Sequence, residues 1–146
     1  MDSKGIDVGI GTDGMSSDMI AQMRSAFLLA RHASKNPTVG FMEIPKMLLE
    51  NNPKILNKIV GWDIGEIVKG NSADIAIVDY NPATPLDESN FLGHLIFGMG
   101  SSPVDTTISA GKIIMQHKKI ISVDAEKMYL EAQELARKVW ERIDRS

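Results

Sequence analysis

The sequence contains no cysteine among its 146 residues. This absence excludes disulfide bonds, thiolate zinc sites and a thiol nucleophile, and it is typical of proteins in a reducing compartment. No apolar run approaches the roughly 20 residues that a membrane-spanning helix requires. The first residues also lack the basic start and apolar core of a signal peptide. We therefore expect a cytoplasmic protein with no membrane partner.

Positive charge and histidine are both scarce. The formal net charge is −3, and the densest basic spot is the pair Lys118-Lys119. A mildly acidic chain without a basic patch gives no electrostatic basis for binding nucleic acid. The only histidines are His32, His94 and His117, which limits the number of imidazole metal ligands that the chain can offer.

The first 60 residues predict one strand followed by helices. A short apolar segment, Ile6–Ile10, runs into a glycine-rich turn, and an apolar stripe at helical spacing then predicts a helix. The stripe comprises Met19, Ile20, Met23, Ala26, Phe27 and Ala30. A second helix is expected near Pro45. A third is expected at Asn52-Pro53, with Asn52 as N-cap and proline in the first helical turn.

After Trp62 the sequence becomes rich in β-forming residues, separated by Gly, Pro, Asn and Ser. Ala110-Gly111-Lys112 predicts a tight hairpin turn, and the tail from Asp124 predicts an amphipathic helix. The expected strands are Ile64–Lys69, Ala73–Tyr80, His94–Met99, Val104–Ala110 and Lys112–Met115. A single parallel strand with helices cannot bury both of its faces, so the first half predicts an incomplete α/β unit.

The segment Gly9–Gly14 has the G-x-G-x-x-G spacing of a dinucleotide-binding turn. Such a turn holds a pyrophosphate at a helix N-terminus. Here Asp13 lies inside the turn and Asp18 at the start of the helix, so two carboxylates would repel the phosphates. No second strand with an acidic end follows about twenty residues later, and dinucleotide binding is therefore the weaker alternative.

Asp13 itself allows two interpretations. A carboxylate at the carboxyl end of a parallel strand, between glycines, is where barrel enzymes place catalytic groups. It could bind a metal ion and accept a proton from metal-bound water. Alternatively, Asp13 could simply cap the following helix, a common role for Asp. The residues alone leave both interpretations open.

Three segments of the sequence resemble a known family. Val8–Met19, Gly65–Asp79 and Thr107–Ile114 resemble the metal-dependent amidohydrolases, in the branch of the triazine chlorohydrolases and the cytosine deaminase-like enzymes. Nearly the whole chain, including the C-terminal helix, is similar to the SsnA-type aminohydrolases. The resemblance implies an α/β fold class: the last strand and helices of a TIM-like barrel, a small antiparallel β-sandwich segment and a C-terminal helix. It implies boundaries at 1–62, 63–123 and 124–146.

The resemblance implies that Asp13 is a metal ligand and proton shuttle, while Gly11 and Gly14 keep side chains away from it. It places Ser16 and Ser17 in a loop on the substrate side, although N-capping is the simpler role for these residues. The cofactor implied for the intact enzyme is a divalent metal ion, with zinc expected, and the partner is a small-molecule substrate.

In this family the other metal ligands lie upstream, in an H-x-H pair and further histidines, whereas no histidine here precedes Asp13. A single carboxylate is too few ligands for a zinc site, and a complete barrel needs about 250 residues. We therefore expect the C-terminal portion of an amidohydrolase, a deaminase or chlorohydrolase acting on C–N or C–Cl bonds. We expect it to be inactive alone, with no tightly bound metal, and to self-associate or dock to the missing N-terminal part. The rival hypothesis is a non-catalytic assembly module.

Overall fold

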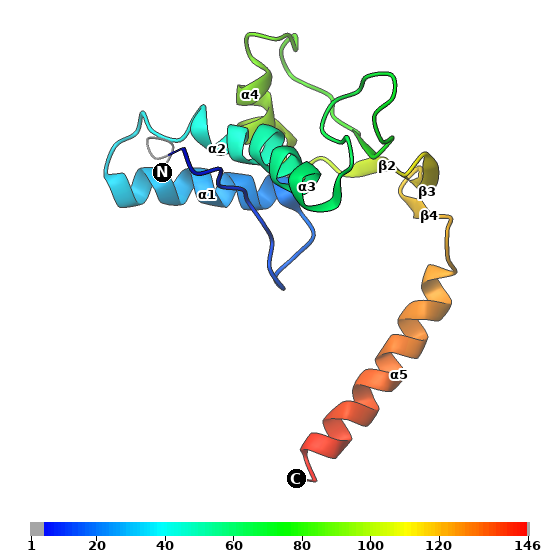
Figure 1. Ribbon diagram of the computed structural model, residues 1–146. Helices are drawn as coiled ribbons and strands as arrows, with labels where there is room; N and C mark the ends of the chain where they lie inside the picture. Colours follow the sequence, from blue (N-terminus) through cyan, green and yellow to red (C-terminus); the bar gives the residue numbers. More distant parts are fainter. Residues whose placement is uncertain (1–4, 146) are drawn as a thin grey trace.

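The computed structural model of the chain describes residues 5–145. A group of helices lies beside a small antiparallel sheet, and a long terminal helix points away from both (Figure 1). The helical elements are α1 (Met19–Ser34), α2 (Glu43–Lys46), η2 (Met47–Asn51), α3 (Asn52–Val60), α4 (Phe91–Gly93), η3 (His94–Gly98), η4 (Met99–Ser101) and α5 (Ala125–Ile143). The strands are β1 (Ile75–Val78), β2 (Val104–Ser109), β3 (Lys112–Gln116) and β4 (Lys119–Ile120).

The predicted first helix is confirmed as α1. Asp18 is its N-cap, because the carboxylate accepts a hydrogen bond from the amide of Ala21 at 2.9 Å. Lys35 closes the helix in the left-handed conformation, with a φ of 53°, as helix C-termini often do. Met23 and Phe27 from the predicted apolar stripe are buried in the core.

The two helices predicted after residue 43 form one continuous rod, so the prediction of a separate N-cap at Asn52 is wrong. Asn52 has helical dihedrals, and its amide donates to the carbonyl of Met47, which is the i→i+5 pattern of a π-turn. The cause is Pro53, which lacks an N–H and whose ring would clash with a carbonyl in a regular α-helix. A wider turn before the proline accommodates the ring without ending the helix.

The sheet has the antiparallel order β1-β2-β3-β4. The predicted hairpin is confirmed: Ala110 and Gly111 have φ values of 46° and 76°, as a two-residue turn with positive φ at both central residues requires. His117 and Lys118 form a second turn of the same kind, with φ values of 49° and 63°. That turn leads into the short strand β4, which the sequence pattern does not predict.

Three predicted strands are absent from the described residues. Ile64–Lys69 has no strand pairing. Ile6–Ile10 has none either, because a strand exists only beside a partner and the sheet is built from later segments. His94–Met99 is helical. A short apolar run fits a buried helix as well as a buried strand, and here Leu95 and Ile96 point into the helical core.

The core is small and helical. Its buried apolar side chains come from three helical elements and comprise Met23, Phe27, Ile44, Leu95 and Ile96. The segment His94–Gly98 therefore packs with α1 and α2, although the expected boundary at residue 62 separates them. The domain boundaries at 1–62, 63–123 and 124–146 remain a prediction.

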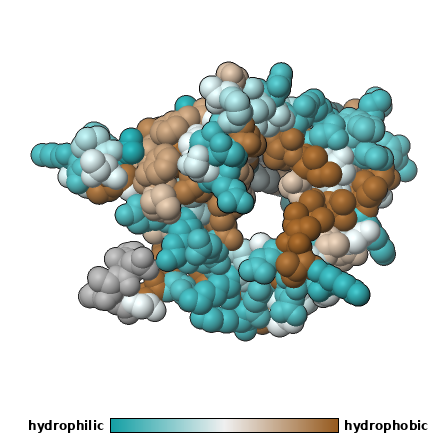
Figure 2. Space-filling view, turned by 90° about the horizontal axis from the view of Figure 1, so that it is seen from above, coloured by the Kyte–Doolittle hydropathy of each residue, from teal (hydrophilic) through white to brown (hydrophobic). Residues whose placement is uncertain are grey.

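Many large apolar side chains remain exposed, and apolar groups interrupt the hydrophilic surface in several places (Figure 2). The predicted amphipathic helix is present as α5, yet the apolar stripe along it is exposed: Leu135, Val139 and Ile143 keep exposed fractions of 61%, 42% and 54%. Among the described residues, no helix is long and apolar enough to span a membrane. The exposed apolar area indicates a surface that another polypeptide can cover.

Candidate functional site

Asp13 lies on a tight turn. The amide of Met15 donates to the carbonyl of Thr12 at 3.2 Å, which closes a turn over residues 12–15. Asp13 occupies the second position with a φ of 50°, a conformation that Asp and Asn tolerate better than most residues. Its side chain is exposed. The turn thus presents a carboxylate to the surroundings and does not bury it.

The structure excludes one of the two roles considered for Asp13, the capping of α1. The cap of α1 is Asp18, five residues later, so Asp13 does not cap this helix. Ser16 supports the cap, because its hydroxyl oxygen accepts from the amide of Asp18 at 3.2 Å. Ser17 is exposed beside it. With the capping role taken by another residue, the position of Asp13 needs a different explanation.

The same geometry argues against a dinucleotide site. The helix begins at Met19, so the glycine-rich turn does not lead directly into its N-terminus. The carboxylate of Asp18 already accepts from the first-turn amide of Ala21, at the place where a phosphate would need free amides. A negative side chain at that position would repel a pyrophosphate.

Gly11 and Gly14 flank Asp13 in open space. A side-chain carbon placed on either glycine would meet no atom of this chain within 4 Å. Both glycines have φ values outside the left-handed region. Atoms of this chain therefore do not require glycine at these two positions. That Gly11 and Gly14 keep side chains away from Asp13 remains a prediction.

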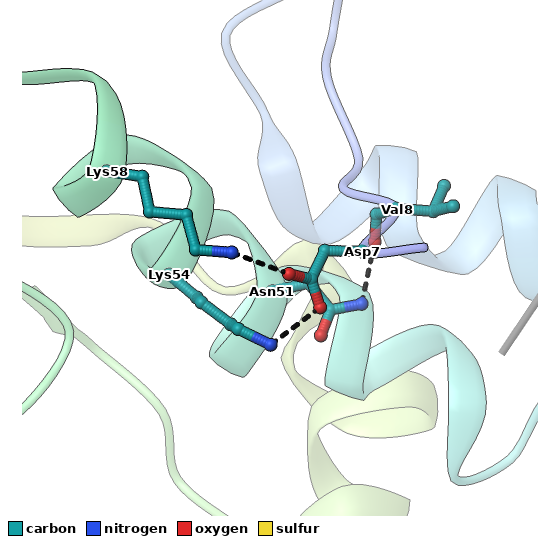
Figure 3. Close-up of polar contacts among 5 residues, drawn as sticks. All are labelled: Asp7, Val8, Asn51, Lys54 and Lys58. Carbon is teal, nitrogen blue, oxygen red and sulfur yellow. Dashed lines mark hydrogen bonds and ion pairs between the residues drawn. The ribbon is translucent and has the colours of Figure 1, made fainter. Parts of the chain in front are cut away.

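Two consecutive asparagines hold the segment that leads into the turn. Asn51 donates its side-chain amide to the carbonyl of Val8 at 2.8 Å (Figure 3). Asn52 donates to the carbonyl of Ile10 at 2.8 Å and accepts from the amide of Ile10 at 2.9 Å. The side-chain amide of Asn carries both a donor and an acceptor, so Asn52 satisfies both polar groups of one peptide residue, as a neighbouring strand would.

An ion-pair cluster ties down the beginning of the same segment. The carboxylate of Asp7 contacts Lys54 at 2.8 Å and Lys58 at 3.1 Å, one turn apart on α3 (Figure 3). Two hydrogen bonds hold the pKa of Asp7 below its ordinary value, and the one from Lys54 has a larger effect than the one from Lys58. The contacts of Asp7, Val8 and Ile10 with one helix fix the course of the segment that ends at Asp13.

The described residues do not supply a complete metal site. No group of three His, Asp or Glu side chains lies close enough to hold a metal ion in the part of the chain that the structure describes. Asp13 fits one position of a coordination sphere, whereas catalytic zinc normally has three protein ligands and an open position. Any further ligands for Asp13 would have to come from outside these residues.

The three histidines lie elsewhere. His32 is in the last turn of α1, where a cation complements the helix dipole. His117 is in a turn, with its ring nitrogen 3.6 Å from Asp105. His94 does not start a strand; it begins the helical segment η3 and contacts Tyr80 at 2.6 Å and Thr84 at 3.2 Å.

Similar curated proteins are deaminases. A 5-methylthioadenosine/S-adenosylhomocysteine deaminase of Pelotomaculum thermopropionicum is 32% identical, with 90% of this chain and 31% of that protein covered. A 5'-deoxyadenosine deaminase of Methanosarcina mazei is also 32% identical, with 97% and 33% covered. The chain thus spans about a third of the length of the curated relatives it matches.

Solved structures show the same fold. An adenosine deaminase from Xanthomonas campestris with bound zinc matches with a TM-score of 0.77 and 23% identity, covering 96% of this chain and 33% of that one. An atrazine chlorohydrolase from Arthrobacter aurescens complexed with zinc matches with a TM-score of 0.68 and 20% identity, covering 91% and 30%. These likenesses confirm the expected fold class, a portion of a TIM-like α/β fold.

The family assignment rests on the sequence. The sequence model of the amidohydrolase family matches residues 1–114, which include the Asp13 turn, the helices up to residue 60 and most of the sheet. The match agrees with the resemblance in the segments around residues 8–19, 65–79 and 107–114. Because it extends over well more than half of the 146 residues, the chain belongs to the amidohydrolase family.

Proposed function

We propose that this chain is part of a metal-dependent amidohydrolase that removes an exocyclic amino group from an adenine nucleoside and releases ammonia. The observation that carries the proposal is the exposed carboxylate of Asp13, presented on a positive-φ turn while Asp18 caps the helix. The names of the relatives support the substrate class, because they are deaminases of 5'-deoxyadenosine and 5-methylthioadenosine.

In this proposal Asp13 has two roles, metal ligand and proton carrier. When bound, a divalent ion such as zinc lowers the pKa of a coordinated water to near neutrality. The carboxylate of Asp13 accepts the proton of the attacking water and passes it to the departing amine, which is general acid–base work. Zinc is the favoured ion, since both structural neighbours described above contain it.

The neighbouring serines have different support. The hydroxyl of Ser16 already takes part in capping α1, which favours the structural role considered for it. Ser17 is exposed next to the turn and is the stronger of the two candidates for contact with substrate. Both assignments predict smaller effects on turnover than a substitution at Asp13.

The partner of this chain is proposed to be a polypeptide that covers its apolar surface. Exposed Leu28 and Leu29 on α1 and the stripe on α5 support this proposal, because large apolar patches usually mark an interface. The partner is either a second copy of this chain or the rest of the amidohydrolase. A cytoplasmic location remains a prediction from the sequence.

The test combines this chain with a second polypeptide that corresponds to the remaining two thirds of the deaminase relatives. Ammonia release from adenosine and 5'-deoxyadenosine is then measured. Asp13→Ala should reduce the rate by at least about a hundred-fold, whereas Asp124→Ala, which removes the cap of α5, should not. Unchanged turnover in Asp13→Ala would show that the catalytic assignment is wrong. Chloride release from a chlorinated triazine, without ammonia release, would replace deamination by dechlorination.

Native mass spectrometry of the chain alone adds a second measurement. We expect a metal-free oligomer, because the described residues hold no cluster of three potential ligands and apolar side chains are exposed. One tightly bound zinc ion per chain would contradict the view that this portion lacks a complete site. A metal-free monomer at micromolar concentration would contradict self-association and leave the rest of the enzyme as the partner.

A further inference from the structure

We propose that Asn52 is a positioning residue for Asp13, a role that rests on the proposed function of that carboxylate. Asn52 comes from α3 and reaches the backbone of Ile10, three residues before Asp13. It is half-buried and uses both ends of its amide on the same peptide residue. Since Ile10 has no strand partner among the described residues, this side chain takes the place of one.

Gly9 indicates that the contact is specific. A side-chain carbon on Gly9 would collide with the carbonyl oxygen of the Asn52 amide, so the closeness of Asn52 to the segment requires glycine there. Gly11 and Gly14, in contrast, face open space within this chain. The first glycine of the G-x-G-x-x-G pattern is therefore explained by Asn52 and not by a bound phosphate.

The distance from Ile10 to Asp13 makes the coupling direct. Only Gly11 and Thr12 intervene, and the carbonyl of Thr12 accepts the hydrogen bond that closes the turn. When Asn52 fixes Ile10, the chain has two residues in which to reach the positive-φ conformation at Asp13. Loss of the Asn52 amide frees Ile10 and broadens the directions in which the carboxylate points.

The same helix offers a matched control. Asn57 also uses both ends of its amide on one peptide residue: it donates to the carbonyl of Ile64 at 3.1 Å and accepts from the amide of Ile64 at 3.2 Å. Asn57→Ala therefore removes the same number and type of hydrogen bonds from α3, at a place that does not lead to Asp13. Positioning and mere stabilisation thus predict different outcomes for the two variants.

The experiment is amide exchange and NMR on the full chain with Asn52→Ala, Asn57→Ala and Gly9→Ala. Two neutral hydrogen bonds correspond to about a 30-fold change, or about 2 kcal/mol. We expect Ile10 exchange to rise by about 30-fold in Asn52→Ala and the Asp13 carbon shifts to lose their positive-φ signature. Gly9→Ala, which displaces the same amide from the other side, should give the same result. Asn57→Ala should accelerate Ile64 and leave the Asp13 shifts unchanged.

A functional readout separates the two proposals. In the reconstituted enzyme, Asn52→Ala should lower kcat at least about ten-fold more than Asn57→Ala, with KM changed equally in both. Equal kcat values for the two variants, or Asp13 shifts that do not move in Asn52→Ala and Gly9→Ala, would overturn the role of Asn52. Undiminished turnover in Asp13→Ala would instead overturn the proposed function, and the exchange data would then describe a structural contact alone.

Discussion

The side chain of Phe27 tests whether the small helical core holds this chain together. It is only 1% exposed. Its ring meets Phe97 edge to face with centroids 5.6 Å apart, and the guanidinium of Arg31 lies 4.0 Å from the ring centre. Truncating a buried Phe to Ala typically costs about 3–5 kcal/mol, and an aromatic pair accounts for about 0.5–1.5 kcal/mol beyond buried area. We expect Phe27→Ala to cost about 4 kcal/mol.

The matched control is Leu28→Ala, the next residue of the same helix, whose side chain is 56% exposed. Leu and Ala have similar helix propensities, so this variant should stay within about 0.5 kcal/mol of the parent. The assay is urea unfolding followed by circular dichroism at several protein concentrations, which separates folding from association. If Phe27→Ala is too unstable to measure, Phe27→Leu provides a milder change of about 1–1.5 kcal/mol.

A small loss in Phe27→Ala, comparable with that in Leu28→Ala, would refute the reasoning. It would mean that packing of α1 against the segment His94–Gly98 contributes little to stability in the chain as it stands. The cluster of five buried apolar side chains would then not act as a core. The exposed apolar surface, once covered by a partner, would have to supply the stabilisation instead.

The carboxyl of Asp7 should titrate below its ordinary pKa, chiefly because of the hydrogen bond from Lys54. The ionised carboxylate stabilises the fold above pH 3.8, and this stabilisation is lost as pH falls through the lowered pKa. Lys54→Met should therefore raise the titration midpoint of Asp7 in carbon NMR. Gly98→Ala should destabilise the chain by about 1–3 kcal/mol in urea unfolding, because the added carbon collides with the ring hydroxyl of Tyr80. Ala110→Gly should raise the unfolding free energy by about 1 kcal/mol in the same assay, because it removes the strain of a side chain at a φ of 46°.

Each of these predictions has a control elsewhere in the chain. Lys127→Met alters an exposed pair on α5 and should leave the titration of Asp7 unchanged. Gly93→Ala places a carbon in open space within a helical turn and should be neutral or slightly stabilising. Gly111→Ala adds strain at a φ of 76° and should lower stability. An argument is contradicted if the variant and its control change the titration midpoint or the unfolding free energy by the same amount.

The sequence predicts the elements with strong local signals. The periodic stripe of α1, the turn at Ala110-Gly111 and the amphipathic tail after Asp124 are all present. The prediction of a strand at His94–Met99 is wrong because a short apolar run does not reveal its own period, and the surrounding helices decide its conformation. The strand at Ile6–Ile10 is not confirmed, because strand pairing depends on neighbours that the described residues do not provide.

The site divides in a similar way. Asp13 becomes a candidate through the resemblance to the amidohydrolases, because the residues alone fit a helix cap as well, and the structure assigns the cap of α1 to Asp18. Asn52 escapes notice in the sequence as a contact of the Asp13 segment, because Asn followed by Pro resembles a helix start. The remaining clue is Gly9. The sequence alone does not show whether this glycine is needed for a turn or for the close approach of a side chain distant in the sequence, and the structure shows the second.

The Asn52-Pro53 pair links the fold to the site. Pro53 cannot donate the hydrogen bond of a regular α-helix, and the preceding turn widens to the i→i+5 pattern that ends at Asn52. In that wider turn Asn51 and Asn52 reach Val8 and Ile10, two residues apart on the incoming segment. π-Turns occur often at functional sites. The irregularity here has a concrete consequence, because it brings two side-chain amides from one helix onto the backbone that ends in the Asp13 carboxylate.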